Sequence, residues 1–268
     1  MRILFLSLLF LSSLYAYNDA DFDGVDDSID VCPNTPILAI VDIDGCSFLA
    51  RASEHHFDIV IGESYSQLDY VTNELTDTLT TSLQVDYFYN NFSFQASGSY
   101  YRSSSDTTNN SGLNDSVLAG YYLFRLNENL NIRLGAGVIL PTYDTDLNNN
   151  NTDYLASINA NYTVDKISYF AGYNYTMIND DDIANVVTYQ DSSAYSIGAG
   201  YHVSDKYYLS TSYYQADSVY ENLDDIKNIS IYNFYSIDTH WFTTFSYAYG
   251  LSDTTSDHFA SIRLGYYF

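Results

Sequence analysis

Apolar and polar residues alternate with a period of two over most of the chain, from His55 to Phe268. The segments "NFSFQASGSY" (91–100), "NLNIRLGAGVIL" (129–140) and "DYLASINANYTV" (153–164) each place apolar side chains at alternate positions. Successive side chains of a β-strand point to opposite faces, so this period predicts strands with one apolar and one polar face. Alternation over about ten residues is typical of strands that cross a membrane within a barrel.

The pattern predicts about twelve strands, whose connections are alternately short and long. Short connections include "NN" at 90–91 and "SDK" at 204–206, whereas "SSSDTTNNSG" and "INDDDIANVVTYQ" are long. Short turns at one end and long loops at the other are typical of outer-membrane barrels. Ten or fourteen strands are alternatives. The predicted strands lie near 54–65, 78–90, 91–103, 113–126, 129–141, 153–164, 166–178, 191–203, 206–218, 227–238, 240–251 and 256–268.

A soluble sandwich would also alternate, and the aromatic residues favour a membrane barrel instead. The 30 Tyr and 15 Phe cluster near strand ends, as in "YFYNNF" and "KYYLS", where amphipathic rings suit the headgroup level. The opposed faces carry Ser, Thr, Asn, Gly and Gln, which suit a wet interior. We therefore expect an all-β fold: a transmembrane antiparallel up-and-down β-barrel surrounded by outer-membrane lipid.

The last predicted strand, "HFASIRLGYYF" (258–268), places Ile262, Leu264, Tyr266 and Phe268 on one face. It resembles the terminal strand that the outer-membrane barrel assembly machinery recognises, which implies that machinery as a partner. An ordinary final strand is the alternative.

The first sixteen residues, "MRILFLSLLFLSSLYA", are typical of a secretory signal peptide, with Arg2 before a short apolar run and Ala16 before the expected cut. The run is too short to span a membrane comfortably, which argues against an anchor. We expect a signal peptide at 1–16, a small module at 17–50 and a barrel at 51–268. Location in the outer membrane of a Gram-negative bacterium follows.

Charge limits the possible partners. The formal net charge is −25, from 9 Lys+Arg and 34 Asp+Glu. Nucleic acid is not expected as a partner, because no basic surface exists to displace its counterions. A polycation or a divalent metal suits such a chain better.

The only two cysteines are Cys32 and Cys46. An even pair this close in an exported chain predicts a disulfide. On the chain-entropy model, closing this loop would stabilise the folded state by about 3 kcal/mol. A zinc site is the alternative, but it lacks a nearby pair of histidines.

Between the signal peptide and the barrel, "DADFDGVDDSID" (19–30) spaces carboxylates as a calcium loop does. Side chains at positions 1, 3 and 5, a Gly at 6, a backbone carbonyl at 7 and a closing acid at 12 can surround Ca²⁺ with oxygen. Asp30 stands at position 12, where an EF-hand has Glu, and no apolar helices flank the loop. A solvated acidic linker is the alternative. The candidate ligands are Asp19, Asp21, Asp23, Val25, Asp27 and Asp30.

The same stretch continues as "VCPNTP" and "VDIDGC", and over residues 19–46 it resembles the thrombospondin type 3 repeat, in the version found in bacterial outer-membrane proteins. The resemblance implies calcium bound by Asp19, Asp21, Asp23, Asp27 and Asp30, and by Val25 through its carbonyl. Asp42 and Asp44 begin a second, incomplete set. Similar repeats often join a barrel to a peptidoglycan-binding domain, a role that does not transfer here.

Parity along the strands predicts which charged side chains point into the barrel. They could orient a small polar solute, or they could form structural ion pairs. The pair on the first and last strands could simply seal the barrel. The candidates are Asp58, Asp86, Arg125, Arg133 and Arg263.

An enzyme is not expected, although some outer-membrane lipases and proteases are barrels of this size. A nucleophilic Ser needs a His base, and spacing places no Ser beside any of the five histidines. "GESYS" (62–66) lacks the second Gly of a nucleophile elbow. We predict a passive porin-like channel for small polar solutes, with a periplasmic calcium module. A non-conducting structural or adhesion-related barrel is the alternative.

Overall fold

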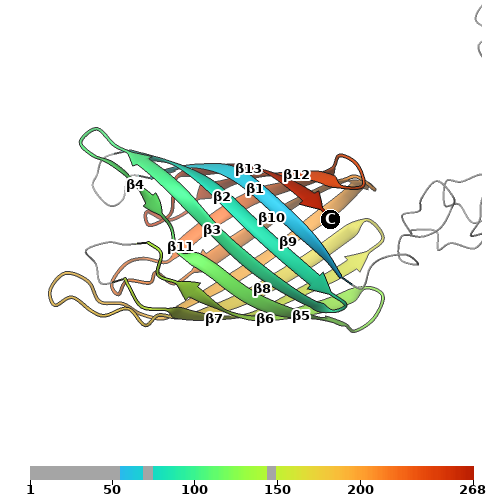
Figure 1. The fold of residues 1–268 in the computed structure, drawn as a ribbon, viewed down its shortest axis with the longest axis horizontal. Helices are drawn as coiled ribbons and strands as arrows, with labels where there is room; N and C mark the ends of the chain where they lie inside the picture. Colours follow the sequence, from blue (N-terminus) through green and yellow to red (C-terminus); the bar gives the residue numbers. More distant parts are fainter. Residues whose placement is uncertain (1–54, 69–74, 144–148) are drawn as a thin grey trace, which may run out of the picture. The chain divides into compact units, whose positions relative to one another are not determined.

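The computed structural model describes residues 55–68, 75–143 and 149–268, which form thirteen β-strands (Figure 1). The predicted signal peptide, calcium loop and disulfide all lie outside these residues. No helix in the described part of the chain is long and apolar enough to cross a membrane. The strands are β1 His55–Leu68, β2 Thr76–Tyr89, β3 Phe92–Ser104, β4 Asn109–Leu113, β5 Ser116–Arg125, β6 Leu130–Leu140, β7 Asp153–Val164, β8 Ile167–Met177, β9 Ser192–Ser204, β10 Tyr207–Ala216, β11 Ile226–Ser236, β12 Trp241–Gly250 and β13 His258–Tyr267.

Twelve of these strands close into an antiparallel barrel. Each pairs with its neighbours in sequence, and β1 pairs with both β2 and β13, which leaves the barrel without an edge. The predicted up-and-down barrel of twelve strands is confirmed. The short β4 was not predicted. It pairs with the end of β3, from Tyr100 to Ser104, and forms a hairpin beyond the barrel wall.

The period-two pattern gives each strand two different faces. In β1, Asp58, Val60 and Gly62 are buried, whereas the intervening Ile59 and Ile61 are 39% and 54% exposed. Large apolar side chains are exposed in this way on every spanning strand. An outer surface of this kind is typical of barrels that face lipid.

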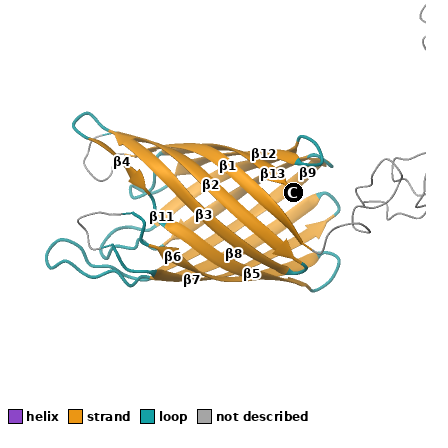
Figure 2. Ribbon diagram, viewed as in Figure 1, coloured by secondary structure: helices purple, strands orange, loops and turns teal. Residues whose placement is uncertain are grey.

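One end of the barrel has tight turns and the other has long connections (Figure 2). Asn90 and Asp165 in the tight turns have φ of 53° and 51°. Asn and Asp adopt this left-handed conformation more readily than most residues, so they suit hairpins of two residues. We call these two ends the turn end and the loop end.

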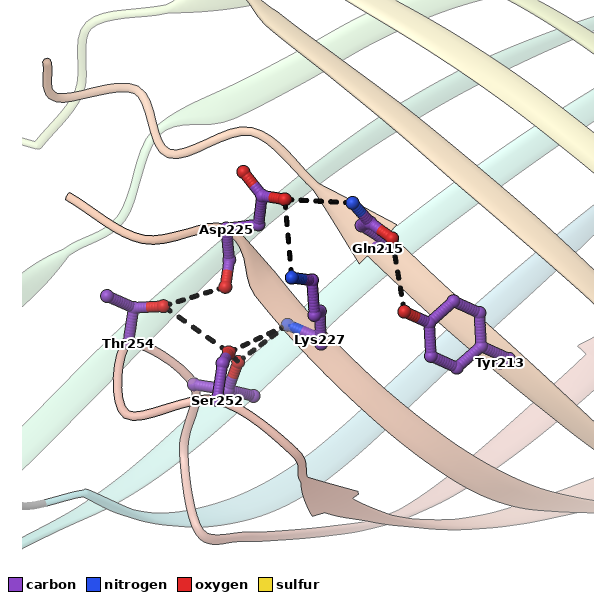
Figure 3. A network of polar contacts seen from close by, with 7 residues as sticks. Tyr213, Gln215, Asp225, Lys227, Ser252 and Thr254 are labelled. Carbon is purple, nitrogen blue, oxygen red and sulfur yellow. Dashed lines mark hydrogen bonds and ion pairs between the residues drawn. The ribbon is translucent and has the colours of Figure 1, made fainter. Parts of the chain in front are cut away.

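The long connections are tied to one another. Segment 178–191 pairs with segment 217–225. The backbone N–H of Gln190 donates to the Val219 carbonyl, and the backbone N–H of Glu221 donates to the Thr188 carbonyl, both at 2.9 Å. A second set of contacts, shown in Figure 3, joins 217–225 to 251–257. There Asp225 Oδ2 lies 3.4 Å from Lys227 Nζ, and Thr254 Oγ1 donates to the Asp225 carbonyl at 2.9 Å. Hydrogen bonds therefore connect these loops to one another at the loop end.

Candidate lumenal site

A cavity of about 450 Å³ lies inside the barrel against strands β1, β2, β11, β12 and β13. Its lining combines charged, amide and aromatic side chains. Among the residues that line it are Asp58, Gln84, Asp86, Tyr232, Phe242 and Arg263. Three of the five charged residues predicted to point inward, Asp58, Asp86 and Arg263, are thus brought together here.

Asp58 and Asp86 lie directly opposite each other in the β1–β2 ladder, and each is only 8% exposed. Gln84 Nε2 donates to Asp86 Oδ2 at 2.6 Å. Asp58 Oδ1 is buried and has no hydrogen-bond partner among the described protein groups; it lies 3.9 Å from Nε2 of His56. Like charges directly opposite in a ladder are unfavourable, and a buried carboxylate needs a partner. Asp58 therefore lacks the protein partner that Asp86 has.

Arg263 reaches across β1 to β2. Its Nη2 donates to Gln84 Oε1 at 2.7 Å, while its buried Nε has no protein partner among the described residues. Asp58 is opposite Tyr267 and Arg263 is opposite Gly62, and no ion pair joins Asp58 to Arg263. Hydrogen bonds thus connect Arg263, Gln84 and Asp86 in a row, and Asp58 is not part of that row.

A second polar group occupies β3, β5 and β6. The Cζ atom of Arg133 lies 3.7 Å from the ring centroid of Tyr121, and Arg133 Nη2 donates to Ser93 Oγ at 3.1 Å. The Tyr121 hydroxyl donates to Gln95 Oε1 at 3.0 Å, and Gln95 is opposite Asp86 in the β2–β3 ladder. Arg133 is therefore held by a ring and a hydroxyl, and not by a carboxylate.

Arg125 lies apart from the other candidates. It is exposed at the turn end of β5, where its Nη1 donates to Asn91 Oδ1. Sequence reasoning did not single out Gln84, Gln95 or Tyr121, which hold the charged residues in place. Gln84 has the same parity as Asp86, but neutral side chains of this kind are common on every lumenal face.

A larger cavity of about 600 Å³ lies nearer the loop end, against β9 to β13. Hydroxyl and amide groups line it together with two rings, and Ser212 Oγ and Ser230 Oγ lie 2.8 Å apart. Its lining includes Ser196, Ser212, Tyr214, Asn228, Ser230 and Phe259.

The connections of the loop end are strongly acidic. Their described residues include no Lys or Arg, and burial raises the pKa of one of their carboxyls, Asp180. The acids are Asp106, Asp115, Asp180, Asp181, Asp182, Asp191, Asp217, Glu221, Asp224, Asp225, Asp253 and Asp257. The field at this mouth attracts cations and repels anions.

The described residues contain no group of three or more His, Cys, Asp or Glu that could hold a metal. The calcium ligands predicted at 19–30 are not among them. His202 Nε2 lies 3.5 Å from Ser168 Oγ, and no described carboxylate orients that ring. The arrangement does not resemble a catalytic triad.

A family model described as "Putative MetA-pathway of phenol degradation" matches residues 54–268. No curated protein matches the sequence. Among solved structures, an outer membrane channel from Pseudomonas putida F1 is similar with a TM-score of 0.64 and 14% identity, covering 80% of this chain and 95% of the other.

Two further structures share the fold at low identity. The NanC porin has a TM-score of 0.54 and 14% identity, covering 78% of this chain and 98% of its own. The translocator domain of the autotransporter NalP from Neisseria meningitidis has a TM-score of 0.51 and 11% identity, covering 81% and 88%. These similarities extend over the barrel and concern its fold.

Proposed function

The chain belongs to the family whose description names the MetA pathway of phenol degradation, and from this premise we propose that it is a passive outer-membrane channel for small polar solutes. The observation that carries the proposal is the polar interior of the closed barrel. Two cavities of about 450 and 600 Å³ lie within it. Hydroxyl and amide groups line both; the smaller also has charged groups, and the larger also has apolar side chains such as Leu68 and Ile226.

A barrel that only held its own shape could fill its interior with side chains. Barrels of 8 strands do so, and those of 16 hold an aqueous channel, so twelve strands allow either. Here the inward positions of β9 and β10 mix small and large residues: Ser196 and Ser212 are small, whereas Tyr214 is large. The rings of Phe170 and Tyr208 cover Gly198 and Gly200. At Ser196 and Ser212, which line the larger cavity, small side chains leave space that large residues would have filled, which favours a path for solutes.

Two classes of solute suit the interior. The smaller cavity is lined by polar groups and by charged groups, some of them without a partner, and such a lining suits small polar solutes. The family description favours a phenolic solute, and the larger cavity, with Tyr214 and Phe259 among several hydroxyls, would suit one ring carrying one hydroxyl group. The similarity to the outer membrane channel from Pseudomonas putida F1 supports transport in either case.

Conductance of the refolded mature chain in a planar bilayer tests the proposal. We expect discrete steps, and we expect Ser230→Trp, inside the larger cavity, to reduce the step size. Ile231→Trp is the matched control, because residue 231 faces outward on the same strand and is 47% exposed. A folded barrel that gives no steps would favour the non-conducting structural or adhesion-related alternative.

We also propose that residues 19–30 bind Ca²⁺ and that Cys32 and Cys46 form a disulfide, in a periplasmic module that precedes the barrel. Calorimetry with CaCl₂ on the mature chain tests the calcium site. Asp23→Asn should weaken binding, and Asp26→Asn should not, because Asp26 is outside the ligand pattern. Equal binding by both variants would favour a diffuse acidic linker.

The C-terminal strand is the proposed recognition element for the barrel assembly machinery. In the structure this strand, β13, closes the barrel against β1.

A further inference from the structure

We infer that the 450 Å³ cavity is a binding site for a small organic cation that also carries a hydrogen-bond acceptor. This inference rests on the channel function proposed above and names the class of solute that the lumen selects. The carboxylate of Asp58 would bind the cationic group, and the Nε–H of Arg263 would donate to the acceptor.

The first observation is the state of Asp58. The residue is 8% exposed, it lines the cavity, and its buried Oδ1 has no hydrogen-bond partner among the described protein groups. A buried carboxylate of this kind is stabilised by a cation that comes close to it. His56 offers little compensation, because its Nε2 lies 3.9 Å away and the ring is charged only when protonated.

The second observation is the state of Arg263. One nitrogen, Nη2, is committed to Gln84, and the buried Nε has no acceptor among the described protein groups. Gln84 in turn donates to Asp86, so Asp86 has a hydrogen-bond partner within the protein. The cavity thus offers one unused acceptor and one unused donor to a solute. Three acidic residues, Asp58, Glu63 and Asp86, line it against one guanidinium, which gives it a negative balance.

The third observation concerns the rest of the wall. Tyr232, Phe242 and Phe259 line the same cavity. Aromatic faces attract organic cations and cover their apolar atoms, which favours an alkylammonium over a hydrated metal ion. The acidic connections of the loop end would also raise the local concentration of cations at the mouth.

Ethanolammonium, which has one ammonium and one hydroxyl group, is a suitable probe. In planar bilayers, reversal potentials under a gradient of KCl and then of ethanolammonium chloride give the cation-to-anion permeability ratio. We expect the wild-type channel to prefer the cation in both salts. Asp58→Asn should lower the ratio about fivefold, as expected for one charge close to a narrow path. Asp77→Asn is the matched control, because it removes one charge from an exposed position of β2 that does not line the cavity.

An anion-selective or unselective wild-type channel would overturn the inference and leave the channel function intact. So would an Asp58→Asn variant with an unchanged ratio, because Asp58 would then be neutral or remote from the path. A silent barrel would instead overturn the channel function. Calorimetry with ethanolammonium chloride on the folded wild-type barrel in detergent then decides the site by itself: heat of binding that ethylene glycol does not give supports it, and no heat refutes it. The same measurement serves if Asp58→Asn does not fold.

Discussion

The side chain of Arg263 lies directly over Gly62 on the neighbouring strand. A Cβ atom placed on Gly62 would be 2.7 Å from Arg263 Cγ and 3.0 Å from Ser82 Oγ. Gly62 therefore leaves the space through which Arg263 reaches Gln84 on β2. Gly62 in the barrel wall thus allows Arg263 on β13 to contact Gln84 on β2 across the whole width of β1.

Gly62→Ala should displace Arg263 and break its bond to Gln84. We expect a loss of about 1–3 kcal/mol in the free energy of unfolding, because the added methyl overpacks the site. Urea unfolding of the refolded barrel measures it. Gly120→Ala is the control, because its nearest atoms, in Phe94, are 3.4 Å from the added Cβ. Equal losses in both variants would contradict the steric role of Gly62.

Arg133 should stabilise the barrel through Tyr121 and Ser93. Removing the cation in Arg133→Gln loses a cation–π contact and a hydrogen bond, and we expect a loss of about 1–2 kcal/mol in urea unfolding. Arg102→Gln is the control, since its Cζ is 5.8 Å from the Tyr100 ring centroid and its side chain is exposed. A result in which Arg102→Gln is the more damaging change would show that the Tyr121 contact contributes little.

The turn between β11 and β12 should respond to acid. The Asp238 carboxylate accepts the backbone N–H groups of His240 and Trp241, both at 2.8 Å, and these bonds lower its pKa. The folded pKa is below the unfolded value, so the stabilisation is present above the unfolded pKa and is lost as pH falls through the folded pKa. We expect the protection factors of the two amides, each relative to an unfolded chain at the same pH, to fall as the pH drops below about 4. Asp238→Ala should show low protection factors at every pH, and pH-independent protection in the wild type would refute the role.

The contacts in Figure 3 should be unequal in strength. The Asp225–Lys227 ion pair is more than a third exposed on both sides, so Lys227→Gln should change stability by less than about 1 kcal/mol. Thr254→Val removes the donor to the Asp225 carbonyl and should speed exchange in 251–257. Hydrogen exchange measured segment by segment distinguishes the two variants. A larger effect of Lys227→Gln than of Thr254→Val would mean that the ion pair, and not the hydroxyl, stabilises these loops.

The alternation of side chains made the barrel predictable. Each spanning strand lies within a few residues of its expected position; β1, for example, extends to Leu68 where 65 was expected. The exception is β4, with the sequence "NNSGL". This strand has only five residues and pairs with β3 alone, so its sequence is too short to show a clear alternation.

The arrangement inside the lumen was less predictable. Parity identifies the face of a strand on which Asp58, Asp86 and Arg263 lie, but not which of them meet. That depends on the stagger between strands, which places Arg263 opposite Gly62 and Asp58 opposite Tyr267. The stagger is a property of the closed barrel as a whole. Whether these residues bind a solute remains a prediction.

The pairing of β1 with β13 has a consequence for how the protein is made. Ten residue pairs, from Asp58–Tyr267 to Gln67–His258, join the first and last described strands. The ladder has the highest sequence separation in the fold, and contacts of that kind form late. Until β13 has been synthesised and delivered, β1 remains an unpaired edge that any other strand could capture. The chain therefore needs protection against aggregation throughout its export, and closure of the wall is an event of the complete polypeptide.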